Sequence, residues 1–287
     1  MKARRKHIWM ALLVAGTLLG GKAVFGQSQT APQQPGQAPS NKPAGQQVAP
    51  LTVEPAAPPV SAEEEAAMKG FRDAPASDLA KKDQMGEDFV QKYPQSRYRA
   101  EVYNWLVKGY LSTNQVDKME VAGDKELELV PNDAQTLAIV GSTLPRAMNA
   151  STPDPQKRLA KAEQYCKKAL ELLPTLVKPE SLTDEAFQKA KDQTAAMAYS
   201  GLGLVQFRRG KYAEAIPNFE QSAKLDPMPD PVNYYLLGVS NEKASHFDDA
   251  VSAFSKCAEM PGGMQVNCKN GAEEAKKLAA TQLSAPK

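Results

Sequence analysis

Apolar residues along residues 196–262 follow a pattern that occurs twice. When this stretch is compared with itself at an offset of 35 residues, seven positions pair like with like. The pairs are Tyr199 with Tyr234, Leu202 with Leu237, Gly203 with Gly238, Tyr212 with Phe247, Ala215 with Ala250, Ile216 with Val251 and Phe219 with Phe254. Within each copy, large apolar residues return every three or four positions, which places them on one face of a helix. The pattern predicts two consecutive helical hairpins, and a period of about 34 is typical of helical solenoids.

Small residues and prolines mark the limits of the predicted helices. Gly203 and Ala215 are small where two helices must cross closely, and Gly210 provides the turn between them. Pro227 ends the second helix. We expect Pro217 in the first turn of that helix, where the backbone N–H has no helical partner. One such hairpin cannot bury its own apolar face, so it must stack on neighbours.

Weaker copies of the same unit precede the clear ones. The expected repeats lie at about 63–95, 100–132, 134–174, 196–229 and 231–262, and a capping helix follows at 264–282. The capping helix carries many charged residues, as the end of a helical stack requires. The sequence therefore predicts an all-α domain at 62–283.

Two insertions interrupt the pattern. The third repeat is longer than the clear copies and contains Pro145, Pro153 and Pro155, which predict a loop at 145–155. The second insertion, 175–195, has helical spacing that continues into the fourth repeat. One helix should therefore run from about Thr183 to Arg209.

The spacing in the clear copies resembles the tetratricopeptide repeat. Tyr199, Leu202-Gly203, Ala215 and Phe219 follow its W-x2-L-G-x2-Y…A-x3-F…P pattern. This resemblance covers residues 62–283 and implies a right-handed all-α solenoid of about five repeats. Residues 89–110 contain Lys-Tyr-Pro-Gln-Ser-Arg-Tyr and are similar to an edge motif in tetratricopeptide proteins of the bacterial envelope. Those proteins include the barrel-assembly lipoprotein and the Tol–Pal-associated periplasmic protein.

The N-terminal part of the chain has the pattern of an export signal followed by a tether. Four cations precede a short apolar run, so residues 1–26 predict a signal peptide, cut after Gly26 or, alternatively, after Ala23. The apolar run is short for a membrane span, so a retained anchor is the weaker alternative. Residues 27–61 are rich in Pro, Gln and Ala and predict a disordered, dispensable tether. We therefore expect an exported protein, either periplasmic or secreted.

Charge and histidine content exclude several classes of function. The whole chain has a formal charge of +2, and removing the five cations of residues 1–26 leaves 30 basic and 33 acidic residues, or −3. This balance gives no electrostatic case for nucleic-acid binding. His7 lies in the signal and His246 in a turn, so histidine-based metal binding has no support. We expect no enzyme activity and no cofactor, and we interpret the carboxylates as solvated helix surfaces.

The cysteines predict one crosslink. Cys257 and Cys268 lie symmetrically about Gly262 and Gly263, so a hairpin that turns there places them at one height. Export favours their oxidation to a disulfide. The alternative is that Cys257 only fills a small core position. Cys166 lies on an expected inner helix face and predicts a buried free thiol.

The tetratricopeptide resemblance also implies a binding groove, lined by the first helix of each repeat, for a peptide or a partner helix. The corresponding positions are Asn104, Lys108, Arg146, Leu204, Phe207, Arg208, Tyr235 and Glu242. Asn104 and Lys108 lie one turn apart and could together hold a partner's carboxylate, although the family's full carboxylate clamp is not found. We expect Phe207, Arg208 and Tyr235 to anchor the partner. The alternative is that one of the insertions folds over the groove and buries these side chains.

The function that follows is a non-enzymatic protein-interaction scaffold of the cell envelope. The alternatives are an assembly factor of the barrel-assembly or Tol–Pal-associated type, or an accessory subunit of an envelope enzyme. The expected partner is a protein or peptide, with membrane contact only through an uncleaved signal.

Overall fold

A computed structural model describes residues 60–284, in which all regular structure is helical. The helices are α1 (Ala62–Asp73), α2 (Leu79–Lys92), α3 (Arg99–Ser112), α4 (Val116–Leu129), α5 (Ala134–Ala147), α6 (Pro155–Leu172), the short 3-10 helix η1 (Leu173–Thr175), α7 (Asp184–Arg208), α8 (Tyr212–Leu225), α9 (Pro231–Lys243), α10 (Phe247–Glu259) and α11 (Gln265–Ser284). The predicted signal and residues 27–59 of the predicted tether lie outside the described residues.

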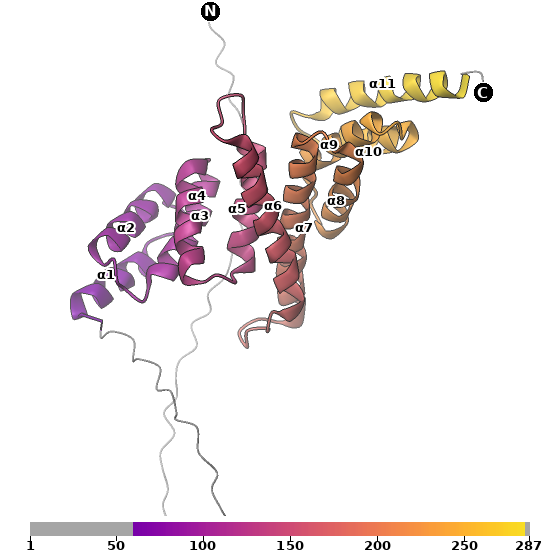
Figure 1. The fold of residues 1–287 in the computed structure, drawn as a ribbon. Helices are drawn as coiled ribbons and strands as arrows, with labels where there is room; N and C mark the ends of the chain where they lie inside the picture. Colours follow the sequence, from indigo (N-terminus) through magenta and orange to yellow (C-terminus); the bar gives the residue numbers. More distant parts are fainter. Residues whose placement is uncertain (1–59, 285–287) are drawn as a thin grey trace, which may run out of the picture. The chain divides into compact units, whose positions relative to one another are not determined.

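Consecutive helices pack against one another as hairpins (Figure 1). In addition, α5 packs along α7, and α11 lies against α10 and α9. The long helix expected from the second insertion is α7, and the Thr183 side chain caps it by accepting a hydrogen bond from the Ala186 N–H at 3.2 Å. Within residues 60–284, none of the helices combines the length and the hydropathy needed to cross a bilayer.

Glycines at the helix crossings make room for large side chains of the facing helix. A Cβ atom added at Gly203 of α7 would lie 2.7 Å from the ring of Phe219, which is fully buried. Phe254 fits in the same way between Gly238 and Gly271, at 2.6 Å and 2.8 Å from the added Cβ atoms. Because Gly271 belongs to α11, this helix covers Phe254 as the first helix of a further hairpin would.

A third crossing brings α5, α6 and α7 together around Cys166. Added Cβ atoms at Gly141 and Gly201 would each lie 2.5 Å from its sulfur. Cys166 is a free, fully buried thiol. Its burial raises the pKa of the thiol to about 12, so it stays protonated at neutral pH. The sequence pattern identified Gly203 of α7 but not Gly201.

In three hairpins, one residue of the second helix contacts one residue of the helix that follows. The two positions are equivalent in all three, but the side chains differ. Ser222 of α8 accepts a hydrogen bond from Asn233 of α9 at 3.2 Å. Cys257 of α10 is disulfide-bonded to Cys268 of α11, with 5.7 Å between their Cα atoms. The corresponding residue of α4 is Glu126, whose carboxylate lies near Thr136 of α5. Ser222 and Cys257 are small residues where α4 has a carboxylate.

Two prolines lie elsewhere than expected. Pro217 is inside α8 and beyond its first turn, because the helix begins at Tyr212. It is tolerated because Pro217 and Ala213, whose carbonyl loses its helical donor, are both accessible to water. Pro145 belongs to the last turn of α5 and not to the following loop, where it costs only one helical hydrogen bond.

The interpretation of all carboxylates as solvated surface is wrong for two residues. Asp83 of α2 is 5% exposed and Glu126 is 2% exposed. Neither oxygen of Asp83 has a hydrogen-bond partner within residues 60–284, and its carboxylate faces Gly109 of α3. Burial, helped by the negative charge of Glu87, raises the pKa of Asp83 to about 6.

Candidate functional site

Lys108 of α3 is a half-buried cation with unused hydrogen-bond donors. Its Nζ donates to Oδ1 of Asn104, one turn earlier on α3, at 2.8 Å. Among residues 60–284, no carboxylate oxygen lies within 4.0 Å of this nitrogen. Burial lowers the pKa of the Lys108 ammonium, and the negative charges of Asp133 and Glu126 act in the opposite direction. Since an ammonium group has three donors, Lys108 can bind a further oxygen acceptor.

Asn104 is held in one orientation by the start of α5. Its Nδ2 donates to Asp133 Oδ2 at 3.2 Å and to Thr136 Oγ1 at 3.3 Å. Asp133 is itself fixed, because it caps α5 by accepting the Thr136 backbone N–H at 2.8 Å. The Asn104 oxygen therefore points to Lys108. Both polar groups of Asn104 have partners within the fold, and the joint binding of a partner's carboxylate by Asn104 and Lys108 stays a prediction.

Glu126 completes this group, and the sequence analysis did not identify it. Its Oε2 has no hydrogen-bond partner within the described residues. Burial, together with the negative charge of Asp133, raises the pKa of Glu126 to about 7, against the hydrogen bond from Thr136 and the charge of Lys108. We call the five residues Asn104, Lys108, Glu126, Asp133 and Thr136 the Lys108 cluster.

Arg146 is paired with other residues of the fold. Its guanidinium forms an ion pair with Asp230, the N-cap residue of α9. Its Nη2 also lies 3.4 Å from Ser200 Oγ and 3.4 Å from Asn233 Oδ1. These contacts tie the end of α5 to the start of α9, so Arg146 already has an internal counter-charge, and its role in partner binding stays a prediction.

Two further expected groove residues are engaged by the protein itself. Arg208 donates from Nε to the Pro145 carbonyl at 3.1 Å and from Nη2 to the Met148 carbonyl at 3.0 Å. The end of α5 and the following loop therefore contact Arg208, but the residue stays exposed and is not buried as the competing interpretation proposed. Leu204 is 4% exposed and belongs to a core cluster with Phe219, so its side chain is not available to a partner.

Phe207, Tyr235 and Glu242 are partly exposed, but each has an internal partner. The Phe207 ring makes an edge-on contact with Tyr212 at 5.3 Å between centroids, and Tyr235 lies 5.7 Å from Phe254. Glu242 pairs with Lys243 at 3.3 Å. The two rings therefore pack partly against core clusters, and their role in partner binding stays a prediction.

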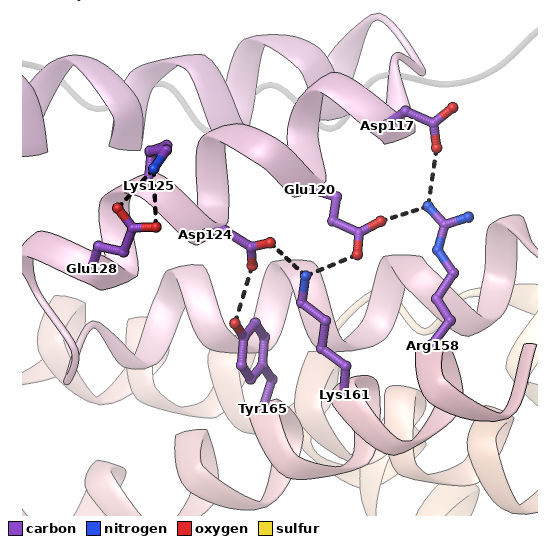
Figure 2. A network of polar contacts seen from close by, with 8 residues as sticks. All are labelled: Asp117, Glu120, Asp124, Lys125, Glu128, Arg158, Lys161 and Tyr165. Atoms are coloured by element: carbon purple, nitrogen blue, oxygen red, sulfur yellow. Dashed lines mark hydrogen bonds and ion pairs between the residues drawn. The ribbon is translucent and has the colours of Figure 1, made fainter. Parts of the chain in front are cut away.

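A second group of charged residues joins α4 to α6 and contains its own counter-charges. Figure 2 shows Glu120 between Arg158 and Lys161, at 2.7 Å and 2.8 Å. Lys161 also pairs with Asp124 at 2.6 Å, and Tyr165 donates its hydroxyl hydrogen to the same carboxylate at 3.1 Å. These paired charges bridge the second and third hairpins, and they differ from Lys108, which has no carboxylate partner among the described residues.

A pocket of about 240 Å³ lies between α8, α9 and α10, and no pattern in the sequence had indicated it. Its lining includes Lys224, Lys256, Glu220 and Asp249. Because the lining contains both cations and anions, the pocket selects no single class of ligand.

Comparison with known proteins agrees with the repeat pattern. The family model described as tetratricopeptide repeat matches residues 196–228, which comprise the C-terminal part of α7, α8 and the residues just after it. No curated protein matches the sequence.

Several solved structures have similar folds. A crystal structure of MamA is 19% identical over 70% of this chain and 94% of its own, with a TM-score of 0.45. The thermophilic TPR protein TTC0263 of Thermus thermophilus is 16% identical over 74% and 98%, with a TM-score of 0.45. PilW, a type IV pilus biogenesis factor, is 16% identical over 77% and 91%, with a TM-score of 0.47. Likeness at this level assigns neither a partner nor an activity. Residues 196–228 therefore match the tetratricopeptide repeat, and the recurring helical hairpins around them agree with a fold of that kind.

Proposed function

We propose that this protein is an exported, non-enzymatic scaffold that binds an acidic peptide segment of a partner protein through the Lys108 cluster. A stack of helical hairpins offers an extended binding surface, which supports a scaffold role. The signal-like pattern of residues 1–26 supports export to the periplasm or the exterior.

The observation that carries the proposal is the state of Lys108. A half-buried ammonium is costly unless an anion or several acceptors compensate it. Lys108 has one neutral acceptor, Asn104, at 2.8 Å, whereas Lys161 has two carboxylates within 2.8 Å. A partner carboxylate would give Lys108 the direct ion pair that it lacks, and the fixed amide of Asn104 holds the ammonium in place to receive it.

The test compares two synthetic decapeptides of alternating alanine and a second residue. One carries glutamate and a free C-terminus, and the control carries glutamine and an amidated C-terminus. We expect only the acidic peptide to bind. Lys108→Met should weaken its binding at least about tenfold, which is the loss expected when one charge-assisted hydrogen bond is removed. Isothermal titration calorimetry measures both constants.

Lys224→Met is the matched control, because it removes a lysine of α8 outside the Lys108 cluster. It should leave the affinity unchanged. Equal affinity of the wild-type protein and Lys108→Met would contradict the proposed site, and equal binding of both peptides would contradict the proposed chemistry.

A further inference from the structure

We infer that binding of a partner carboxylate at Lys108 is coupled to the uptake of one proton by Glu126, so that the site holds acidic partners more tightly below neutral pH than above it. This inference rests on the proposed function, because it concerns the same carboxylate site. The proton comes from solvent and is taken up by the carboxylate of Glu126.

The first argument is the position of Glu126. Its side chain is 2% exposed, and its Oε2 has no partner among the described residues. An ionised carboxylate in this position lacks both water and a full set of donors, so its charge is poorly compensated. Ser222 and Cys257 occupy the corresponding place in later hairpins, which shows that the fold does not require a carboxylate there.

The second argument is the charge balance of the cluster. The groups that face Glu126 from the neighbouring helices are Lys108 of α3 and Asp133 at the start of α5. With Glu126 ionised, the cluster contains two anions and one cation, and an incoming carboxylate would be a third anion. With Glu126 protonated, Lys108 and Asp133 balance, and the incoming carboxylate meets no uncompensated negative charge.

The third argument is that the titration falls in the physiological range. Burial and Asp133 raise the pKa of Glu126 to about 7. A bound anion nearby raises the pKa further, because it disfavours the ionised form. By linkage, a ligand that raises this pKa must bind more weakly as the pH rises above the pKa of the free protein.

The experiment uses the alternating alanine–glutamate decapeptide and the full exported chain. With the wild-type protein, we expect the dissociation constant to rise about tenfold between about pH 6 and about pH 8, as uptake of up to one proton requires. Titration in buffers of different ionisation enthalpy should show proton uptake on binding. Glu126→Gln should remove both the pH dependence and the proton uptake.

Asp83→Asn is the matched control, because Asp83 is also a buried carboxylate of raised pKa but lies outside the Lys108 cluster. It should keep the pH dependence of the wild-type protein. If Glu126→Gln fails to fold, carbon-13 NMR of the wild-type Glu126 carboxyl group gives the same answer. Its titration midpoint should move upward when the peptide is bound.

The outcomes separate the two proposals. If Lys108→Met removes binding but the wild-type affinity is equal at pH 6 and pH 8, the proton coupling is wrong and the binding site stands. If the Glu126 midpoint does not move with peptide bound, the coupling is also wrong. If Lys108→Met binds like the wild-type protein, the proposed site itself is wrong, and the coupling falls with it.

Discussion

Replacing Glu126 by glutamine tests the electrostatic account of the Lys108 cluster without any ligand. The substitution keeps the size and shape of the side chain and removes its charge. Because the pKa of Glu126 rises from 4.5 in the unfolded chain to about 7 in the fold, the stability that depends on its protonation is fully present below about pH 4.5. This stability is lost as the pH rises through about 7, so the wild-type protein should weaken across that range and Glu126→Gln should not.

The magnitude follows from the pKa shift. A shift of about 2.5 pKa units corresponds to about 3 kcal/mol at 1.36 kcal/mol per unit. The linkage relation gives the size of this loss at each pH. Relative to low pH, the difference in unfolding free energy between Glu126→Gln and the wild-type protein should grow in favour of the variant by about 1 kcal/mol at pH 5 and about 3 kcal/mol at pH 8. Asp83 titrates in both proteins and cancels from the difference.

Urea unfolding followed by circular dichroism at several pH values measures this difference. The slope of the unfolding free energy against urea should be the same in both proteins, because they bury the same surface. A difference between the two proteins that stays constant from pH 5 to pH 8 would refute the reasoning. It would mean that the Glu126 carboxylate is as well compensated in the fold as in water.

Three further predictions follow from other parts of the chain. Asp83→Asn should raise the free energy of unfolding by about 3 kcal/mol above about pH 6, because the pKa of Asp83 rises from 3.8 to about 6, and urea unfolding at pH 5 and pH 8 checks this. Cys257 and Cys268 should be found joined when peptides of the exported, unreduced protein are mapped by mass spectrometry, and the bond should contribute at most about 3 kcal/mol, whereas finding two free thiols would contradict it. The intact mass of the exported protein should correspond to a chain that begins at Gln27, with Val24 as the alternative, and a chain that still begins at Met1 would contradict signal cleavage.

The sequence predicted the helical hairpins where large and small residues face each other. Phe219 with Gly203 and Phe254 with Gly238 are complementary pairs across a crossing, and each repeats in sequence at a fixed interval. The interval is fixed because the same packing contact recurs in each hairpin. The sequence could not place Pro217 correctly, because its position within α8 depends on where the helix begins, and tolerance of proline there depends on exposure.

Only the contacts of the candidate site between residues close together in sequence could be predicted. Asn104 and Lys108 lie one turn apart on α3, so their contact follows from helix geometry. Arg146 and Asp230 are 84 residues apart, and their ion pair depends on how α5, α7 and α9 meet in space. In the sequence, nothing distinguishes Glu126 from any other acidic residue on an amphipathic helix. Only its alignment with Ser222 and Cys257 indicates that it faces the next hairpin.

The most direct test of the central claim is to observe the Lys108 side chain while an acidic partner binds. Nitrogen-15 NMR of the lysine ammonium groups, recorded during addition of the alanine–glutamate decapeptide, reports which lysine meets the carboxylate. We predict that the Lys108 resonance, assigned by its absence from Lys108→Met, shifts in a saturable way with the same dissociation constant as calorimetry gives. Binding that shifts other lysines and leaves Lys108 unchanged would contradict the account.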